Sequence, residues 1–234
     1  MIEGFTFLNW RRVASHLLAL SAFSVLGVFA VQAQQFSADI VTRHDGVSSA
    51  AGRLSVRDGK VRIETVEHAD GFFLVDPAKP SATFVRPGAR VFMDAGQSTR
   101  LTRVFVPVDP DAPCRQWQAM ARLAGVAGEG TWRCDQTGEE TIEGRSTVAF
   151  KVVSGAGQEF AGWIDRELAF PLRIKTEDGA LVALTAIKDA PQPVSSFEIP
   201  ASFRKFSLDA LMERIKQSDV WVAQPGEPSS PPAK

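Results

Sequence analysis

The sequence predicts a mainly β domain of the α+β class, in which one antiparallel sheet wraps around two helices. Many short segments alternate apolar and polar residues, which is typical of strands with one buried face. Two pairs of these segments are joined by Asp58-Gly59 and Asp178-Gly179. Because glycine readily takes the positive φ of a tight turn, each pair predicts a β-hairpin. Such a sheet has one covered face and one wet face.

Residues 1–33 are predicted to form a cleavable signal peptide, and they are set aside before the fold is considered. Arg11 and Arg12 precede a nearly uncharged apolar run, Leu17 to Val31. We expect cleavage between Ala33 and Gln34, and no cysteine of a lipoprotein signal lies nearby. An uncleaved membrane anchor is the alternative, but it would need about 20 apolar residues. Cleavage predicts an exported, periplasmic protein.

The rest of the chain is predicted to be a single domain, residues 34–223, followed by a disordered Pro/Ser-rich tail, residues 224–234. Removal of residues 1–33 leaves 24 basic and 26 acidic residues, a net charge of −2. A chain with this balance lacks the excess of positive charge that binds nucleic acid or an anionic membrane. We therefore expect no nucleic-acid partner and only transient membrane contact, if any. The oligomeric state is not indicated.

The expected elements follow the chain in order. Strands are predicted at residues 36–41, 53–57, 61–64, 72–75, 82–85, 91–93, 139–142, 147–153, 160–165, 172–176 and 181–187. Helices are predicted at residues 114–123 and 208–215, where apolar residues recur at helical spacing. Ser207 is placed to cap the second helix.

The mature chain contains two cysteines, Cys114 and Cys134, and we expect them to form a disulfide because the compartment is oxidising. Their spacing does not fit a metal site. Free, buried thiols are the other alternative. A disulfide would tie the start of the first helix to the strand that follows.

No catalytic constellation is recognisable. His44 and His68 each lie in a polar turn, and neither has further ligands at zinc-like spacing. No serine nucleophile motif occurs, and Glu139 and Glu140, as neighbours on a strand, point to opposite faces. We therefore predict no catalytic residue, metal site or cofactor, and a protein that is not an enzyme.

The strand at residues 160–165 is unusual because it carries apolar residues on both faces. Phe160 and Ile164 share one face, whereas Trp163 lies on the other. Aromatic residues are usually core residues. The functional alternative is that one face lines a ligand cavity, and Trp163 is then the candidate lining residue.

Several segments, in their order along the chain, resemble the periplasmic lipoprotein-carrier superfamily and its uncharacterised relatives. They are Phe36–Ile40, Gly52–Ile63, Gly162–Asp165, Phe170–Ile174 and Phe197–Pro200. The resemblance implies a strongly curved antiparallel sheet, or half-barrel, closed by two or so short helices around an apolar cavity for acyl chains.

One departure concerns the arginine on which the carriers depend. The carriers have an Arg-Pro step after the second strand, whereas Arg57 here is followed by Asp58-Gly59. The role of the carrier arginine therefore does not transfer to Arg57.

These observations favour a soluble periplasmic binding or carrier protein, without catalytic activity, for an apolar ligand such as a lipid or an acylated protein. An envelope interaction or assembly protein without a small ligand is one alternative. A secreted enzyme is the other, although few candidate bases are present.

Overall fold

The computed structural model describes residues 34–95 and 99–217. The predicted signal peptide and the predicted tail at residues 224–234 lie outside the described residues. The strands are β1 (Gln35–His44), β2 (Val47–Arg57), β3 (Lys60–Thr65), β4 (Phe72–Asp76), β5 (Ser81–Arg86), β6 (Val91–Asp94), β7 (Arg133–Ile142), β8 (Arg145–Val153), β9 (Glu159–Asp165), β10 (Phe170–Thr176), β11 (Leu181–Asp189) and β12 (Arg204–Lys205). The α-helices are α1 (Leu101–Val104), α2 (Pro113–Leu123) and α3 (Leu208–Gln217).

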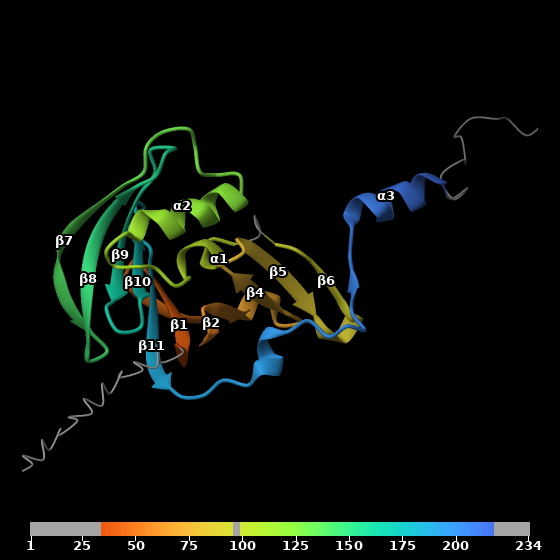
Figure 1. The fold of residues 1–234 in the computed structure, drawn as a ribbon, viewed down its shortest axis with the longest axis horizontal. Coiled ribbons are helices and arrows are strands. Elements are labelled where there is room, and N and C mark those ends of the chain that lie inside the picture. Colours follow the sequence, from red (N-terminus) through yellow and green to blue (C-terminus); the bar gives the residue numbers. More distant parts are fainter. Residues whose placement is uncertain (1–33, 96–98, 218–234) are drawn as a thin grey trace, which may run out of the picture. The chain divides into compact units, whose positions relative to one another are not determined.

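The twelve strands of the described residues belong to one curved, open sheet, in the order β12-β6-β5-β4-β3-β2-β1-β11-β10-β9-β8-β7 (Figure 1). Two meanders, β1 to β6 and β7 to β11, meet where β1 pairs with β11, with Ile40 opposite Leu184. Every pairing is antiparallel except that of β12 with β6. The sheet does not close into a barrel. The predicted fold class, a mainly β protein with a strongly curved antiparallel sheet, is confirmed.

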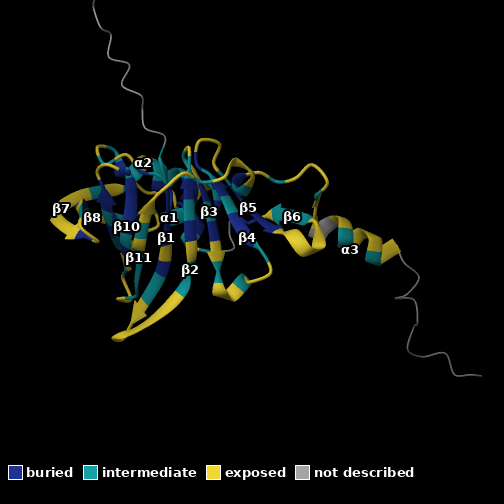
Figure 2. Ribbon diagram, turned by 90° about the horizontal axis from the view of Figure 1, so that it is seen from below, coloured by how far each residue is buried: buried dark blue, intermediate teal, exposed yellow. Residues whose placement is uncertain are grey.

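The hairpins follow from their turn residues. Asp58 and Gly59 have φ of 50° and 80°, and Glu143 and Gly144 have φ of 51° and 76°. Two consecutive positive φ angles define the turn that matches the twist of paired strands. Residues 43–50 at the far end of the β1–β2 hairpin are all exposed, and they form the yellow tip in Figure 2.

The core lies between the inner face of the sheet and helices α1 and α2, which cross that face in Figure 1. Alternate strand residues such as Leu54, Ile63 and Leu172 are fully buried. From the helical side, Trp117 and Met120 of α2 complete this cluster. Alternation along the strands therefore built the covered face that the sequence predicts.

Both predicted helices are present, as α2 and α3. The Ser207 hydroxyl accepts a hydrogen bond from the Ala210 amide at 3.2 Å, as expected of a helix cap. Met212 is 46% exposed, and no described side chain of α3 belongs to the core. The helices that cover the sheet are α2 and the short α1. The sequence does not reveal α1.

Candidate functional site

A pocket of about 400 Å³ lies between helices α1 and α2 and the adjoining ends of β9 and β10. Its lining combines an apolar wall with a polar mouth. The apolar residues are Val104, Trp117, Ala121, Val126, Trp132, Phe160 and Ile174. The polar ones are Arg100, Arg103, Ser154, Gln158, Glu159, Thr176, Glu177 and Asp178. Such a combination is typical of small-molecule sites.

Trp117 forms the centre of the apolar wall. Its indole nitrogen donates a hydrogen bond to the Val104 carbonyl at 3.1 Å, so its polar atom is satisfied. Its ring meets the Phe160 ring edge-on, with centroids 5.2 Å apart. Gly162 on β9 makes room for the indole, because a Cβ there would lie 2.7 Å from the ring. The surface offered to a ligand is therefore aromatic and apolar.

Two loops rich in glycine, residues 124–132 and 154–158, form another wall of the pocket. The Gly130 amide donates to the Gly155 carbonyl at 3.1 Å, and a Cβ at Gly128 would lie 2.4 Å from the Ala156 nitrogen. Between them Trp132 donates its indole hydrogen to the Ala127 carbonyl at 3.0 Å. This close packing holds Trp132 against the pocket.

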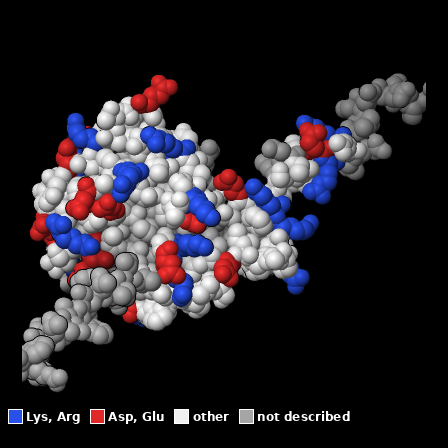
Figure 3. All heavy atoms as spheres, viewed as in Figure 1, with Lys and Arg blue, Asp and Glu red and all other residues white. Residues whose placement is uncertain are grey.

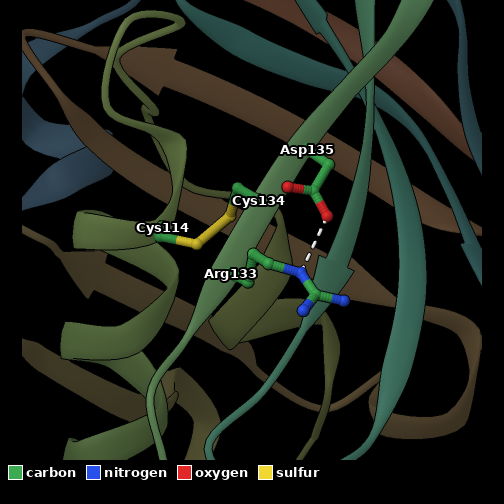
Figure 4. Close-up of a disulfide and its surroundings, with 4 residues drawn as sticks. All are labelled: Cys114, Arg133, Cys134 and Asp135. Carbon is green, nitrogen blue, oxygen red and sulfur yellow. Dashed lines mark hydrogen bonds and ion pairs between the residues drawn. A yellow bond between two sulfur atoms is a disulfide. The ribbon is translucent and has the colours of Figure 1, made fainter.

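The disulfide fixes α2 to this wall. Cys114, in the first turn of α2, is bonded to Cys134 on β7, with the two Cα atoms 5.7 Å apart (Figure 4). The predicted disulfide is therefore confirmed in the structure. Next to it, Arg133 and Asp135 form an exposed ion pair of 2.8 Å. Because α2 carries Trp117 and Ala121, the cross-link holds the helical side of the pocket in register with the sheet.

Arg100 and Arg103 lie at the mouth of the pocket. Burial, and next the like charge of Arg100, lower the pKa of the Arg103 guanidinium. Asp178 also lines the pocket, and hydrogen bonds from Thr176 and Ala180, and to a smaller extent the charge of Arg100, lower its pKa. Arg103 thus carries its charge in a half-buried setting beside another cation.

Trp163 lies on the opposite face of β9 from Phe160, as the alternation predicts. The guanidinium of Arg173 lies 5.2 Å from the centre of its ring, and Arg173 also pairs with Glu140 at 2.7 Å. Trp163 packs at the edge of the core and is not among the residues that line the pocket. Its predicted contact with an apolar ligand stays a prediction. Phe160 is the aromatic residue of β9 that reaches the pocket.

The other polar residues singled out from the sequence are dispersed. His44 contacts Asp45 in an exposed turn, and His68 packs its ring against Phe73 and Phe84. Within residues 34–95 and 99–217, no group of three or more His, Cys, Asp or Glu side chains is placed to hold a metal ion. Glu139 and Glu140 pair with different arginines, Arg166 and Arg173.

The contacts of Arg57 hold segments of the fold together. It donates hydrogen bonds to the Gln35 side chain at 3.0 Å and to the Gln192 carbonyl, and it pairs with Asp58 at 3.1 Å. These contacts tie the start of β1 to the segment after β11. They give Arg57 no part in the pocket.

A second hollow, of about 480 Å³, is dominated by Arg145 and its acidic neighbours. Arg145 contacts Asp165 at 2.5 Å and Asp189 at 2.9 Å. Burial opposes its charge, but these two carboxylates outweigh burial and raise the pKa of Arg145. The buried Asp165 also accepts the Glu167 and Leu168 amides at 2.8 Å each. This cluster is internally satisfied and braces the turn between β9 and β10.

Comparisons with known proteins give likeness in structure only. No family model matches the chain, and no curated protein matches it. Similar solved structures include PNGF-II (TM-score 0.46, 8% identity, covering 79% of this chain and 33% of that one) and MucB (TM-score 0.40, 17% identity, 74% and 59%). A putative outer membrane lipoprotein-sorting protein domain from Vibrio parahaemolyticus is also similar (TM-score 0.32, 9% identity, 70% and 89%).

The chain thus spans about a third of PNGF-II and somewhat over half of MucB. Likeness at these scores assigns neither a family nor a function to this chain. Within the described residues, none of the helices is long and apolar enough to cross a membrane. The case for function therefore depends on the pocket.

Proposed function

We propose that this protein is a non-catalytic periplasmic binding or carrier protein for an apolar ligand, either a lipid or the acyl chain of an acylated protein. The observation that carries the proposal is the pocket of about 400 Å³ with its aromatic wall. Its size lies within the roughly 300–1,000 Å³ range of ligand sites. Each CH₂ group transferred into it from water contributes about 0.8 kcal/mol.

The polar atoms of the wall support an apolar occupant. Trp117 and Trp132 already donate their indole hydrogens to the backbone, at Val104 and Ala127. A ligand that lies against these rings therefore needs no matching acceptor. An acyl chain satisfies this requirement, since it offers only apolar surface.

The chemistry of the mouth supports a binding role rather than catalysis. Arginine stays protonated in proteins and cannot serve as a general base, which leaves the carboxylates. Of these, Glu159 pairs with Lys151 at 2.9 Å, Asp178 accepts hydrogen bonds from the turn that contains it, and Glu177 is exposed. His44 and His68, the histidines of the mature chain, do not line the pocket.

The test is titration with 1-dodecanol, a neutral single-chain probe, followed by tryptophan fluorescence. Val126 lines the pocket yet is 42% exposed, so Val126→Asp places a charge at the site in a position that tolerates one. Val194→Asp, at a site 52% exposed and outside the pocket, is the matched control. We expect saturable binding by the wild type and the control, and weakened binding by Val126→Asp.

An envelope interaction protein without a small ligand is the second candidate. The observation that favours it is the edge strand β7, which is exposed along most of its length. Edge strands carry unpaired backbone groups to which a partner can add a strand. Failure of the wild type to bind any acyl probe would overturn the carrier proposal in favour of this one.

A further inference from the structure

We propose that the ligand of this pocket is a single-chain amphiphile with an anionic head group, a carboxylate or a phosphate, and that the head group binds Arg103. This inference depends on the proposed function, because it assigns the chemistry of the same site. The tail would lie against Trp117 and Phe160, and the head would lie at the mouth.

Arg103 differs from the other half-buried arginines. Four of them pair with a carboxylate: Arg57 with Asp58, Arg62 with Glu64, Arg145 with Asp165 and Arg173 with Glu140. Arg103 is half-buried as well, but its guanidinium takes part in no ion pair or hydrogen bond with any described residue. A half-buried cation without an anion is costly, and an incoming anion would remove that cost.

The surroundings of Arg103 increase the cost of its unpaired charge. Its charged neighbour is Arg100, a second cation, and the two repel each other. The carboxylates that line the pocket do not compensate for Arg103. Lys151 engages Glu159, Asp178 is held by Thr176 and Ala180, and Glu177 is exposed on the rim. An anion bound to Arg103 would offset the repulsion that Arg103 experiences from Arg100.

The positions of the cation and the aromatic wall set the orientation of the ligand. Arg103 precedes Val104, whose carbonyl accepts the Trp117 indole hydrogen, so the charged and apolar parts adjoin. The volume of about 400 Å³ lies near the lower end of the range for ligand sites, which favours one chain over a two-chain lipid. Charges of both signs are interspersed over the face shown in Figure 3, and residues 34–234 carry a net charge of −2, so we assign the anion preference to this site rather than to a broad basic surface.

The experiment compares dodecanoate and dodecyl phosphate with 1-dodecanol at neutral pH, each below the concentration at which it forms micelles. Tryptophan fluorescence measures the affinity of the wild type, Arg103→Gln and Arg53→Gln. Arg53 is exposed on β2 and outside the pocket, so Arg53→Gln removes the same charge elsewhere. We expect the wild type and the control to bind an anion about tenfold more tightly than the alcohol, a difference typical of one charge-assisted hydrogen bond.

Arg103→Gln should lose that preference and bind the three probes with similar affinity, and its saturable binding of 1-dodecanol also shows that it is folded. A preference for dodecanoate alone identifies a carboxylate head group, and a preference for dodecyl phosphate alone identifies a phosphate. Equal binding of all three probes by the wild type would overturn the inference and leave the proposed function intact. A preference for anions that survives in Arg103→Gln would also overturn it. Binding of none of the probes would contradict the proposed function itself.

Discussion

At the scale of single residues, the contact between Gly162 and Trp117 is the most sensitive point of the site. A Cβ at position 162 would lie 2.7 Å from one Trp117 ring atom and 3.3 Å from an Ile174 methyl group. Gly162→Ala should therefore lower the free energy of unfolding by about 1–3 kcal/mol, as overpacking does. Gly138→Ala on β7 is the control, because nothing lies within 4 Å of its added Cβ. Urea denaturation measures both, and equal stability of the two variants would contradict this packing.

The buried Asp165 gives a second prediction at this scale. Its carboxylate is 2% exposed and binds Arg145 as well as two backbone amides. Asp165→Asn should lower the free energy of unfolding by about 1–3 kcal/mol, because the half-buried Arg145 loses its buried carboxylate and keeps only the more exposed ones, such as Asp189. In the exposed pair of Arg133 and Asp135, Asp135→Asn should cost less than about 1 kcal/mol. Thermal and chemical denaturation should rank the variants in this order, and the reverse order would contradict the account.

Sequence reasoning found some residues of the site and missed others, for a physical reason. Trp117 was recognisable because apolar residues recur at helical spacing in residues 114–123. Arg103 carried no such signal, since an arginine in a segment between two elements resembles any solvated charge. What distinguishes it is that none of the described residues is its acidic partner, and this depends on side chains from distant parts of the chain. Trp163 was the predicted lining residue because it is aromatic, whereas Phe160 is the residue of β9 that lines the pocket.

At the scale of elements, alternation and turn chemistry predicted most strands. Two strands were predicted only in part, because their remaining residues are exposed to solvent. Residues 47–52 of β2 and 133–138 of β7 lack alternation because both of their faces are largely solvated. Their strand conformation comes from pairing with β1 and β8. The helix α1 is a single turn, too short for a periodic signal. The pocket depends on this turn, so the position of the pocket was not predictable from the sequence.

The disulfide between α2 and β7 closes a loop across 20 positions of the chain. In the chain-entropy model, a loop of this size stabilises the fold by about 3 kcal/mol. The double variant Cys114→Ser, Cys134→Ser should lose about that much in urea denaturation. It should also bind acyl probes more weakly, because α2 is no longer tied to β7. In native oxidised protein neither thiol should be alkylated, and free labelling of both would contradict the bond.

At the scale of the whole molecule, export predicts that the exported protein lacks its signal peptide. Protein recovered from the periplasm should begin at Gln34, within a residue or two, because the signal peptide is removed. Intact mass measurement gives the start directly. Recovery of the full chain with Met1 in the membrane fraction would support the uncleaved anchor instead.

The proposed function requires that an acyl chain enters the pocket between α2 and β9. The most direct measurement is photolabelling of the whole protein with dodecanoate that carries a diazirine at its tail end, followed by peptide mapping. We expect labels on the peptides that contain Trp117 and Phe160, with loss of labelling when unlabelled dodecanoate is in excess. Saturable labelling confined to the outer face of the sheet or to α3 would contradict it, as would an absence of labelling at any probe concentration below micelle formation.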